Sequence, residues 1–219
     1  MKFDLLLIDF DGVISKNSVR VMLSIAHRAM NKLTPMPMGA LIQALYSTSC
    51  QPPVVTSKLT FHSLGLSEKD LEKYFMELIS TDEFEGEKIK IEEDFYSFIT
   101  YCNDNDLKFK IFSTGSVDSS RFADVVKKYG NEIFYDLTDK YKSNPVIYKE
   151  LLNEFELDPQ KVLHIDDSPL ALRTSKIVGM QTIMMLNDIF DEKQYDIYHE
   201  YIDHKVDTFN ELQKYIENL

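Results

Sequence analysis

The stretch FDLLLIDFDGV, residues 3–13, decides the fold of this chain. Phe3 to Ile8 form a near-continuous apolar run, which is typical of a strand that is buried on both faces of a parallel sheet. The run ends in Asp9-Phe10-Asp11-Gly12, so carboxylates follow directly after the buried segment. We therefore expect a parallel sheet whose first strand carries Asp9 and Asp11 at its carboxyl end.

Beyond about residue 89, strand-like apolar runs alternate with helix-like segments. We expect strands at 107–112, 133–135, 162–165 and 181–185. We expect helices at 92–103, 121–129, 146–155, 170–178 and 209–216. Alternating strand and helix units imply a parallel sheet that is covered by helices on both faces. The predicted fold class is therefore α/β, with a Rossmann-like three-layer core.

Residues 16–88 follow a different pattern. Apolar residues recur at helical spacing from Val19 to Leu33 and again behind Ser67, which with Asp70 forms a capping signal. Four of the seven prolines fall between these two segments and divide the region into short pieces. The chain is thus predicted to consist of a core, residues 1–15 and 89–219, and a small helical domain inserted at 16–88.

Composition restricts the classes of function. The chain has 219 residues and a formal charge of 24 − 36 = −12, and 44% of its residues are hydrophobic, so it has ample apolar surface to bury. The negative charge argues against a nucleic-acid or anionic-membrane binder, which needs a basic face. No apolar run approaches a membrane span of about 20 residues, and the run at residues 5–8 is too short for a signal peptide. The two cysteines, Cys50 and Cys102, favour a reducing cytoplasmic setting.

Unusual polar groups follow three of the expected strands. They are Asp9 and Asp11, the segment Ser113-Thr114-Gly115-Ser116, and Asp166-Asp167. Ligands of open α/β sheets bind beyond the carboxyl ends of the strands, where these groups are expected to meet. Such a set of carboxylates is unfavourable unless it is protonated or binds a metal, and all-oxygen ligands suit Mg²⁺. Taken singly, the three segments could instead be a hairpin turn, a polar loop and a helix N-cap.

Four motifs in order resemble those of the haloacid dehalogenase-like superfamily, in the branch with a helical cap inserted after the first motif. Ile8-Asp9-Phe10-Asp11-Gly12-Val13 matches the first motif, and Phe112-Ser113-Thr114-Gly115 matches the second. Lys142-Ser143-Asn144-Pro145 resembles the third, with Ser143 where proline is usual. His164-Ile165-Asp166-Asp167-Ser168 resembles the fourth. The resemblance spans essentially the whole core and identifies residues 16–88 as the cap by position and helicity.

The resemblance implies a role for each matching residue. Asp9 is expected to be the nucleophile that forms an aspartyl-phosphate, and Asp11 the acid/base group. Ser113, with the backbone N–H groups of Thr114 and Gly115, is expected to hold phosphate oxygens. Lys142 is expected to neutralise both the nucleophile and the phosphate. The implied ligands of Mg²⁺ are Asp9, the backbone carbonyl of Asp11, Asp166 and Asp167.

The implied function is that of a phosphoric monoester hydrolase, a phosphatase that acts on a small phosphorylated metabolite. The dehalogenases of the superfamily lack an acid/base Asp two residues after the nucleophile, so Asp11 argues against carbon–halogen chemistry. Two alternatives stay open, namely a phosphomutase of the β-phosphoglucomutase type and a non-catalytic binding protein of the same fold. The sequence predicts neither the substrate nor the oligomeric state.

For the other polar residues, and for Cys102, we expect structural roles more than catalytic ones. We expect His164 to be packed in the sheet and Cys102 to be buried. Arg121 follows the second motif and could help to hold phosphate, but we expect it to lie on a helix surface. One or two of the basic residues of the cap are expected to face the substrate. These candidates are Arg20, His27, Arg28, Lys58 and His62.

Overall fold

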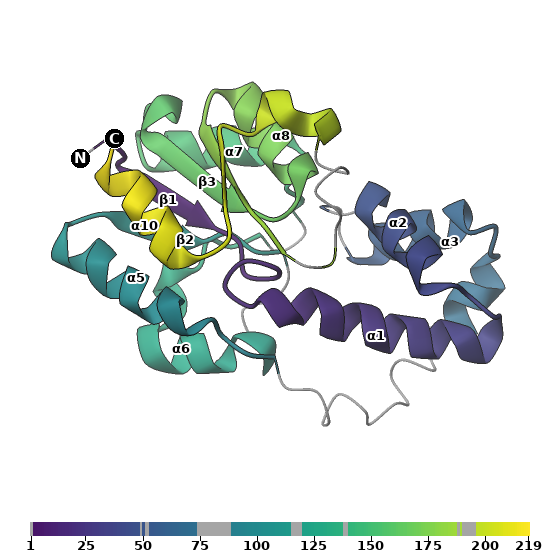
Figure 1. The fold of residues 1–219 in the computed structure, drawn as a ribbon. Helices are drawn as coiled ribbons and strands as arrows, with labels where there is room; N and C mark the ends of the chain where they lie inside the picture. The colour runs from purple at the N-terminus through teal and green to yellow at the C-terminus, as the bar shows by residue number, and fades with distance from the viewer. Residues whose placement is uncertain are drawn as a thin grey trace.

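The structure is a computed structural model that describes residues 2–48, 50, 53–73, 89–114, 120–137, 140–187, 189 and 196–219. Five parallel strands form one sheet in the order β2-β1-β3-β4-β5 (Figure 1). The strands are β1 (Leu5–Ile8), β2 (Lys108–Ile111), β3 (Val162–Asp166), β4 (Gln181–Met185) and β5 (His204–Val206). The predicted α/β fold with a Rossmann-like parallel sheet is confirmed.

Helices cover both faces of the sheet, as predicted. The core helices are α5 (Glu93–Asp104), α6 (Ala123–Tyr129), α7 (Pro145–Glu154), α8 (Pro169–Val178) and α10 (Phe209–Glu217). Helices α5, α6 and α10 pack on one face through buried residues such as Phe95, Val125 and Phe209. Helices α7 and α8 cover the other face, where Tyr148 and Leu172 are buried (Figure 1). Side chains therefore fill both sides of β1, which explains its unbroken apolar run.

Among the described residues, three complete helices and the first turns of a further one, at residues 68–73, lie between β1 and α5. The complete helices are α1 (Lys16–Leu33), α2 (Met38–Thr48) and α3 (Pro53–Ser63), and they lie at the right of Figure 1. Leu23, Met30, Leu41 and Phe61 form a hydrophobic cluster separate from those of the sheet. The two connections to the core run side by side, since the Glu92 N–H donates to the Ile14 carbonyl at 2.9 Å. We call residues 16–73 of this structure the helical insertion.

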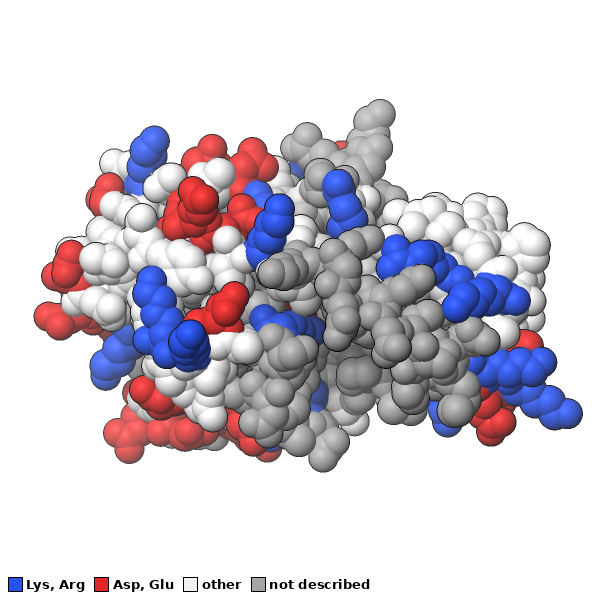
Figure 2. Space-filling view, turned by 90° about the horizontal axis from the view of Figure 1, so that it is seen from below, with Lys and Arg blue, Asp and Glu red and all other residues white. Residues whose placement is uncertain are grey.

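The helical insertion and the core differ in charge. Residues 16–73 contain seven Lys and Arg and three Asp and Glu, which gives 7 − 3 = +4 within a chain of net charge −12. In Figure 2, Lys and Arg side chains stand along the helical insertion at the right with a few acidic ones, and the core at the left carries side chains of both signs. Over residues 16–88 the sequence has eight Lys and Arg and eight Asp and Glu, so the positive excess is confined to residues 16–73.

Two local expectations are corrected and one is confirmed in part. Residues 133–135 do not form a strand, because a 3-10 turn at Asn131–Ile133 precedes a single bridge between Phe134 and Ile111. The edge strand β5 was not expected, since it has three residues and two of them, His204 and Lys205, are polar. The capping signal at Ser67 is confirmed, because its N–H donates to the Asp70 carboxylate at 3.0 Å. The predicted continuation of that helix beyond residue 73 lies outside the described residues.

No helix in the described ranges is both long and apolar enough to cross a membrane.

The start of α10 provides a test of local stability. The Thr208 hydroxyl accepts a hydrogen bond from the Glu211 N–H at 3.1 Å, while Glu211 accepts from the Asp207 N–H at 2.8 Å. Replacing a side chain that caps a helix in this way costs about 1 kcal/mol. We expect Thr208→Ala to lower the free energy of unfolding by about that amount in urea titrations. Thr208→Ser should retain most of it, and equal stability of all three proteins would contradict this role of the cap.

Candidate active site

The register of the sheet brings the predicted polar groups to one edge. Ile8 of β1 pairs with Ile111 of β2 and with Ile165 of β3. The next residue on β1 is Asp9, whose N–H donates to the Ile165 carbonyl at 2.9 Å. The next residue on β3 is Asp166, so the two carboxylates lie side by side on neighbouring strands. The convergence that was expected from the strand ends is therefore observed.

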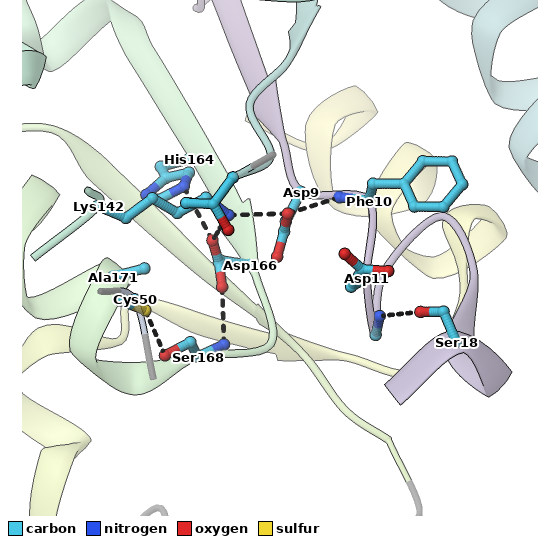
Figure 3. A network of polar contacts seen from close by, with 12 residues as sticks. Asp9, Phe10, Asp11, Ser18, Cys50, Lys142, His164, Asp166, Ser168 and Ala171 are labelled. Atoms are coloured by element: carbon cyan, nitrogen blue, oxygen red, sulfur yellow. Dashed lines mark hydrogen bonds and ion pairs between the residues drawn. The ribbon is translucent and has the colours of Figure 1, made fainter. Parts of the chain in front are cut away.

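Lys142 links these two carboxylates. Its Nζ lies 2.8 Å from Oδ1 of Asp9 and 2.7 Å from Oδ2 of Asp166, as Figure 3 shows. The lysine is 3% exposed, and Tyr148, also buried, donates its hydroxyl to the Lys142 carbonyl at 3.1 Å. Burial lowers the pKa of Lys142, but the charges of Asp166 and Asp9 outweigh it and raise that pKa above its usual value. The ammonium group is therefore charged and held in place from both ends of the residue.

Asp9 is fixed through one of its oxygens. Oδ1 accepts from Lys142 and from the Phe10 N–H at 2.6 Å, while Oδ2 has no hydrogen-bond partner among the described residues. Burial raises the pKa of Asp9 to about 7, with Lys142 opposing the shift and Asp166 adding to it. The side chain thus presents one uncommitted oxygen to the space beyond the strand ends.

Asp166 has partners at both oxygens. Oδ1 accepts from the Ser168 N–H at 2.8 Å, and Oδ2 is shared by Lys142 and Nε2 of His164, at 2.7 and 3.3 Å. Burial raises the pKa of Asp166, but Lys142 and His164 outweigh it and lower that pKa to about 2. Asp166 is therefore ionised and rigidly held.

His164 is buried in the sheet, as predicted, and also supports the site. Burial lowers its pKa, so the ring is neutral and can donate from Nε2 towards Asp166. Its Nδ1 lies 2.9 Å from Oγ of Ser175 on α8. A buried chain of polar contacts thus runs from α8 through His164 and Asp166 to Lys142 and Asp9. The period-2 position of His164 on its strand places it beside Asp166, but sequence spacing does not reveal the 3.3 Å contact between Nε2 and Oδ2.

Asp167 is the third buried carboxylate. Its Oδ2 accepts from Nδ2 of Asn187 at 2.8 Å. Burial raises its pKa well above the usual value, and the charges of Asp166 and Asp9 add to the shift. Oxygen atoms of Asp9, Asp166 and Asp167 lie within 4.8 Å of one another. Among the described residues, this is the one such group of possible metal ligands.

The charges of this cluster fit a divalent cation. Three carboxylates face the single ammonium group of Lys142, so two negative charges are uncompensated at the centre of the cluster. Burial is the main cause of the raised pKa values of Asp9 and Asp167, and the neighbouring negative charges add to it. An all-oxygen donor set of this kind is what hard divalent cations bind. The residues present therefore satisfy both the charge and the donor requirement of such an ion.

The second predicted motif follows β2. Ser113 is buried at 6% exposure, one residue beyond Phe112, whose N–H donates to the Ile8 carbonyl at 2.8 Å. Ser113 thus leaves the sheet beside Phe10, directly next to the two aspartates of the first motif. Thr114 is half-buried, and its carbonyl accepts a hydrogen bond from Arg121. The predicted phosphate-binding residue Gly115 lies outside the described residues.

Asp11 has a partner that the sequence did not predict. Its Oδ2 lies 2.5 Å from Nη1 of Arg121, and both side chains are largely buried. The expectation that Arg121 lies on a helix surface is wrong, because residues 120–122 form a 3-10 turn that directs it to the site. The cause is a contact between residues 110 positions apart, and no local spacing signals it.

The helical insertion also reaches the site. Sγ of Cys50 lies 3.0 Å from Oγ of Ser168, and the Ser143 N–H donates to the Cys50 carbonyl at 3.3 Å (Figure 3). Cys50 has a positive φ of 67°, which is uncommon for a residue with a side chain. The sequence drew attention to basic residues instead, and one of them, His27, contacts Met36 within the helical insertion. That one or two of those basic residues face a substrate stays a prediction.

A family profile described as haloacid dehalogenase-like hydrolase matches residues 6–185. The chain belongs to the haloacid dehalogenase-like hydrolases. The match covers most of the chain, including β1 to β4 and the helical insertion. The resemblance that the four motifs suggested is therefore confirmed. No curated protein sequence matches this chain.

Solved structures of haloacid dehalogenase-like proteins resemble this one over their whole length. A conserved member from Agrobacterium tumefaciens has 18% identity and a TM-score of 0.71, with 99% of this chain and 98% of that chain covered. A predicted phosphoglycolate phosphatase from Haemophilus somnus has 14% identity and a TM-score of 0.72, with 99% of each chain covered. A putative β-phosphoglucomutase from Bacteroides vulgatus has 15% identity and a TM-score of 0.68, covering 99% of this chain and 88% of that chain. At these identities the likeness establishes the fold.

Gly12 offers a test of the packing at this site. It has a φ of +79°, and a Cβ added there would lie 2.1 Å from Oδ2 of Asp167. Gly65 of the helical insertion has a similar φ of +73° with nothing within 4 Å of the added Cβ. A side chain in this left-handed region costs about 1–2 kcal/mol, so both Ala variants should lose stability in chemical denaturation. We expect Gly12→Ala to lose hydrolase activity as well and Gly65→Ala to keep it; equal activities would contradict the proposed contact.

Proposed function

We propose that this chain is a Mg²⁺-dependent phosphatase that hydrolyses a small phosphorylated metabolite through an aspartyl-phosphate on Asp9. The observation that carries the proposal is the state of Asp9, which Lys142 and the Phe10 N–H hold by one oxygen while the other stays uncommitted. A carboxylate fixed in this way, with cations beside it, can approach a phosphorus atom without repulsion from the phosphate.

Two residues carry out the proposed bond changes. Oδ2 of Asp9 attacks phosphorus, the bond between phosphorus and the ester oxygen breaks, and Asp11 gives that oxygen its proton. A water molecule then attacks the phosphorus of the aspartyl-phosphate and loses a proton to Asp11, and the bond to Asp9 breaks. Inorganic phosphate leaves, and both aspartates return to their starting states. Ser113 and the backbone of Thr114 and Gly115 hold the phosphate oxygens in this scheme.

The proposed Mg²⁺ ligands are Asp9, Asp167 and the backbone carbonyl of Asp11. Both oxygens of Asp166 already have partners, so Asp166 contributes its negative charge and holds Lys142. When bound, Mg²⁺ neutralises charge on the phosphate and the nucleophile. Together with Lys142 it balances the charges of the three carboxylates Asp9, Asp166 and Asp167.

The proposed division is a core of residues 1–15 and 89–219 and a helical cap of residues 16–88 that closes over the site. The contact of Cys50 with Ser168 supports it, because this contact joins the insertion to the loop that carries Asp166 and Asp167. One structural neighbour, CbbY from Rhodobacter sphaeroides, is bound to xylulose-1,5-bisphosphate, which supports a small phosphorylated metabolite as the class. The free thiols of Cys50 and Cys102 agree with the proposed cytoplasmic location.

The first test is phosphate release. We expect the chain to release phosphate from p-nitrophenyl phosphate and from members of a panel of sugar and nucleotide monophosphates in the presence of Mg²⁺. Chelation should stop the release, and Asp9→Asn should reduce it to the background rate because the nucleophile is lost. The matched control is Asp158→Asn, since Asn keeps the capping contact of Asp158 with the Gln160 N–H. Isomerisation primed by a bisphosphate would instead assign a phosphomutase, and no reaction of either kind would assign a binding protein.

A second test separates the two neighbouring aspartates. We expect Asp167→Asn to raise the Mg²⁺ concentration for half-maximal activity by at least about 10-fold, because a ligand charge is lost. Asp166→Asn should lower the maximal rate with a smaller change in that concentration, because Lys142 loses a partner. Mg²⁺ titrations of activity and calorimetric titrations of the unreacted protein measure both effects. The reverse pattern would assign the direct ligand role to Asp166.

A further inference from the structure

Arg121 connects two loops of the site. Nη1 lies 2.5 Å from Oδ2 of Asp11, and Nη2 donates to the carbonyl of Thr114. Asp11 belongs to the loop after β1, and Thr114 belongs to the loop after β2. A planar guanidinium with several donors in fixed directions can bridge two such acceptors, whereas an ammonium group is a single point of charge. Arg121 therefore sets the distance between the two loops as well as the position of Asp11.

Aromatic packing holds the guanidinium in place. Cζ of Arg121 lies 4.5 Å from the ring centroid of Phe122, which is 1% exposed. The Phe122 ring packs edge-on against Phe10, with centroids 4.6 Å apart and an angle of 88° between the rings. Phe10 is the residue between Asp9 and Asp11. The Arg121 guanidinium therefore packs on Phe122, and Phe122 packs on the residue that joins the two aspartates.

The contact between the two side chains leaves one buried atom of each without a partner. Arg121 contacts Oδ2 of Asp11, while Oδ1 of Asp11 and Nε of Arg121 are buried and have no hydrogen-bond partner among the described residues. An unsatisfied buried polar atom is destabilising. A polar reactant that enters the site can satisfy such atoms. Oδ1 of Asp11 is therefore the oxygen available to the reactant.

We propose that Arg121 is a positioning residue that orients the Asp11 carboxylate, so that Oδ1 faces the ester oxygen that leaves and the water that attacks. This inference rests on the proposed function, because it assumes that Asp11 transfers a proton. Arg121 acts through Asp11 and the Thr114 carbonyl, so it is distinct from a residue that binds the phosphate itself.

Leaving-group dependence tests this role. Proton transfer to an alkyl oxygen is essential, whereas a nitrophenolate leaves without one, so a misplaced Asp11 harms alkyl esters most. We expect Arg121→Met to lower kcat by about 10- to 100-fold on an alkyl phosphate, within the range of general acid–base effects. On p-nitrophenyl phosphate the loss should be clearly smaller, and KM should change little on either substrate. Arg121→Lys should recover part of the rate, since a charge returns but the bridge between two loops does not.

A double-mutant cycle supplies the second readout. If Arg121 acts through Asp11, adding Arg121→Met to Asp11→Asn should cost no further activity on the alkyl phosphate. The matched control is Arg173→Met, because Arg173 is an exposed residue of α8 whose guanidinium lies 5.8 Å from the Tyr201 ring. Its kinetics should equal those of the wild type. Circular dichroism and thermal unfolding of each variant identify any protein that fails to fold, in which case Arg121→Lys carries the test.

The outcomes are distinct. A rise in KM with unchanged kcat, or a further loss in the double variant, would overturn the inference and assign Arg121 to phosphate binding or to structure. Unchanged kinetics of Arg121→Met would overturn it as well. Equal losses on both esters would place the effect in the attack of water on the aspartyl-phosphate, the step that the two esters share. If the wild-type chain releases phosphate from no ester, the proposed function is wrong, and the inference fails with it. If the wild type is active, the variants test the role of Arg121 alone.

Discussion

One buried ammonium group determines how this site is built. Lys142 stands between Asp9 and Asp166, and removing one partner of such a buried ion pair costs about 3–5 kcal/mol. The chain around Lys142 is accordingly fixed, because Tyr148 donates to its carbonyl and also packs against the His164 ring. Two strands, one loop and one helix are therefore positioned by a single charge. The excess of carboxylates over cations then favours the binding of a divalent cation.

The register of the parallel sheet places the two carboxylates next to each other. Asp9 and Asp166 are each one residue beyond the paired residues Ile8 and Ile165, so their separation follows from the register and not from flexible loops. Apolar side chains fill both faces of β1 and hold that register. The polar groups meet only where the strands end and water or a ligand can reach them. The apolar residues 5–8 of β1 thus stabilise the sheet, and the next residue, Asp9, belongs to the candidate site.

What the sequence predicts depends on the range of the interaction. The buried strands and their terminal carboxylates follow from local pattern, and the structure has them in the expected order. The strand expected at 133–135 is not formed. A 3-10 turn precedes Phe134, and Phe134 makes only a single bridge to the sheet. Arg121 was misplaced for the opposite reason, since its partner Asp11 is 110 residues away and local periodicity carries no information about it. The contact of Cys50 with Ser168 is likewise a product of the tertiary fold.

The two aspartates of the first motif show why these long-range contacts matter. Asp9 and Asp11 are separated by one residue, yet Asp9 is bound to an ammonium group and Asp11 to a guanidinium group. Phe10 between them packs on Phe122, so a shift of one side chain is transmitted to the others. Two chemically identical groups can perform different steps of one reaction only if their surroundings differ. Here the difference is supplied by residues from two distant loops, and this asymmetry is what the proposed roles of the two aspartates require.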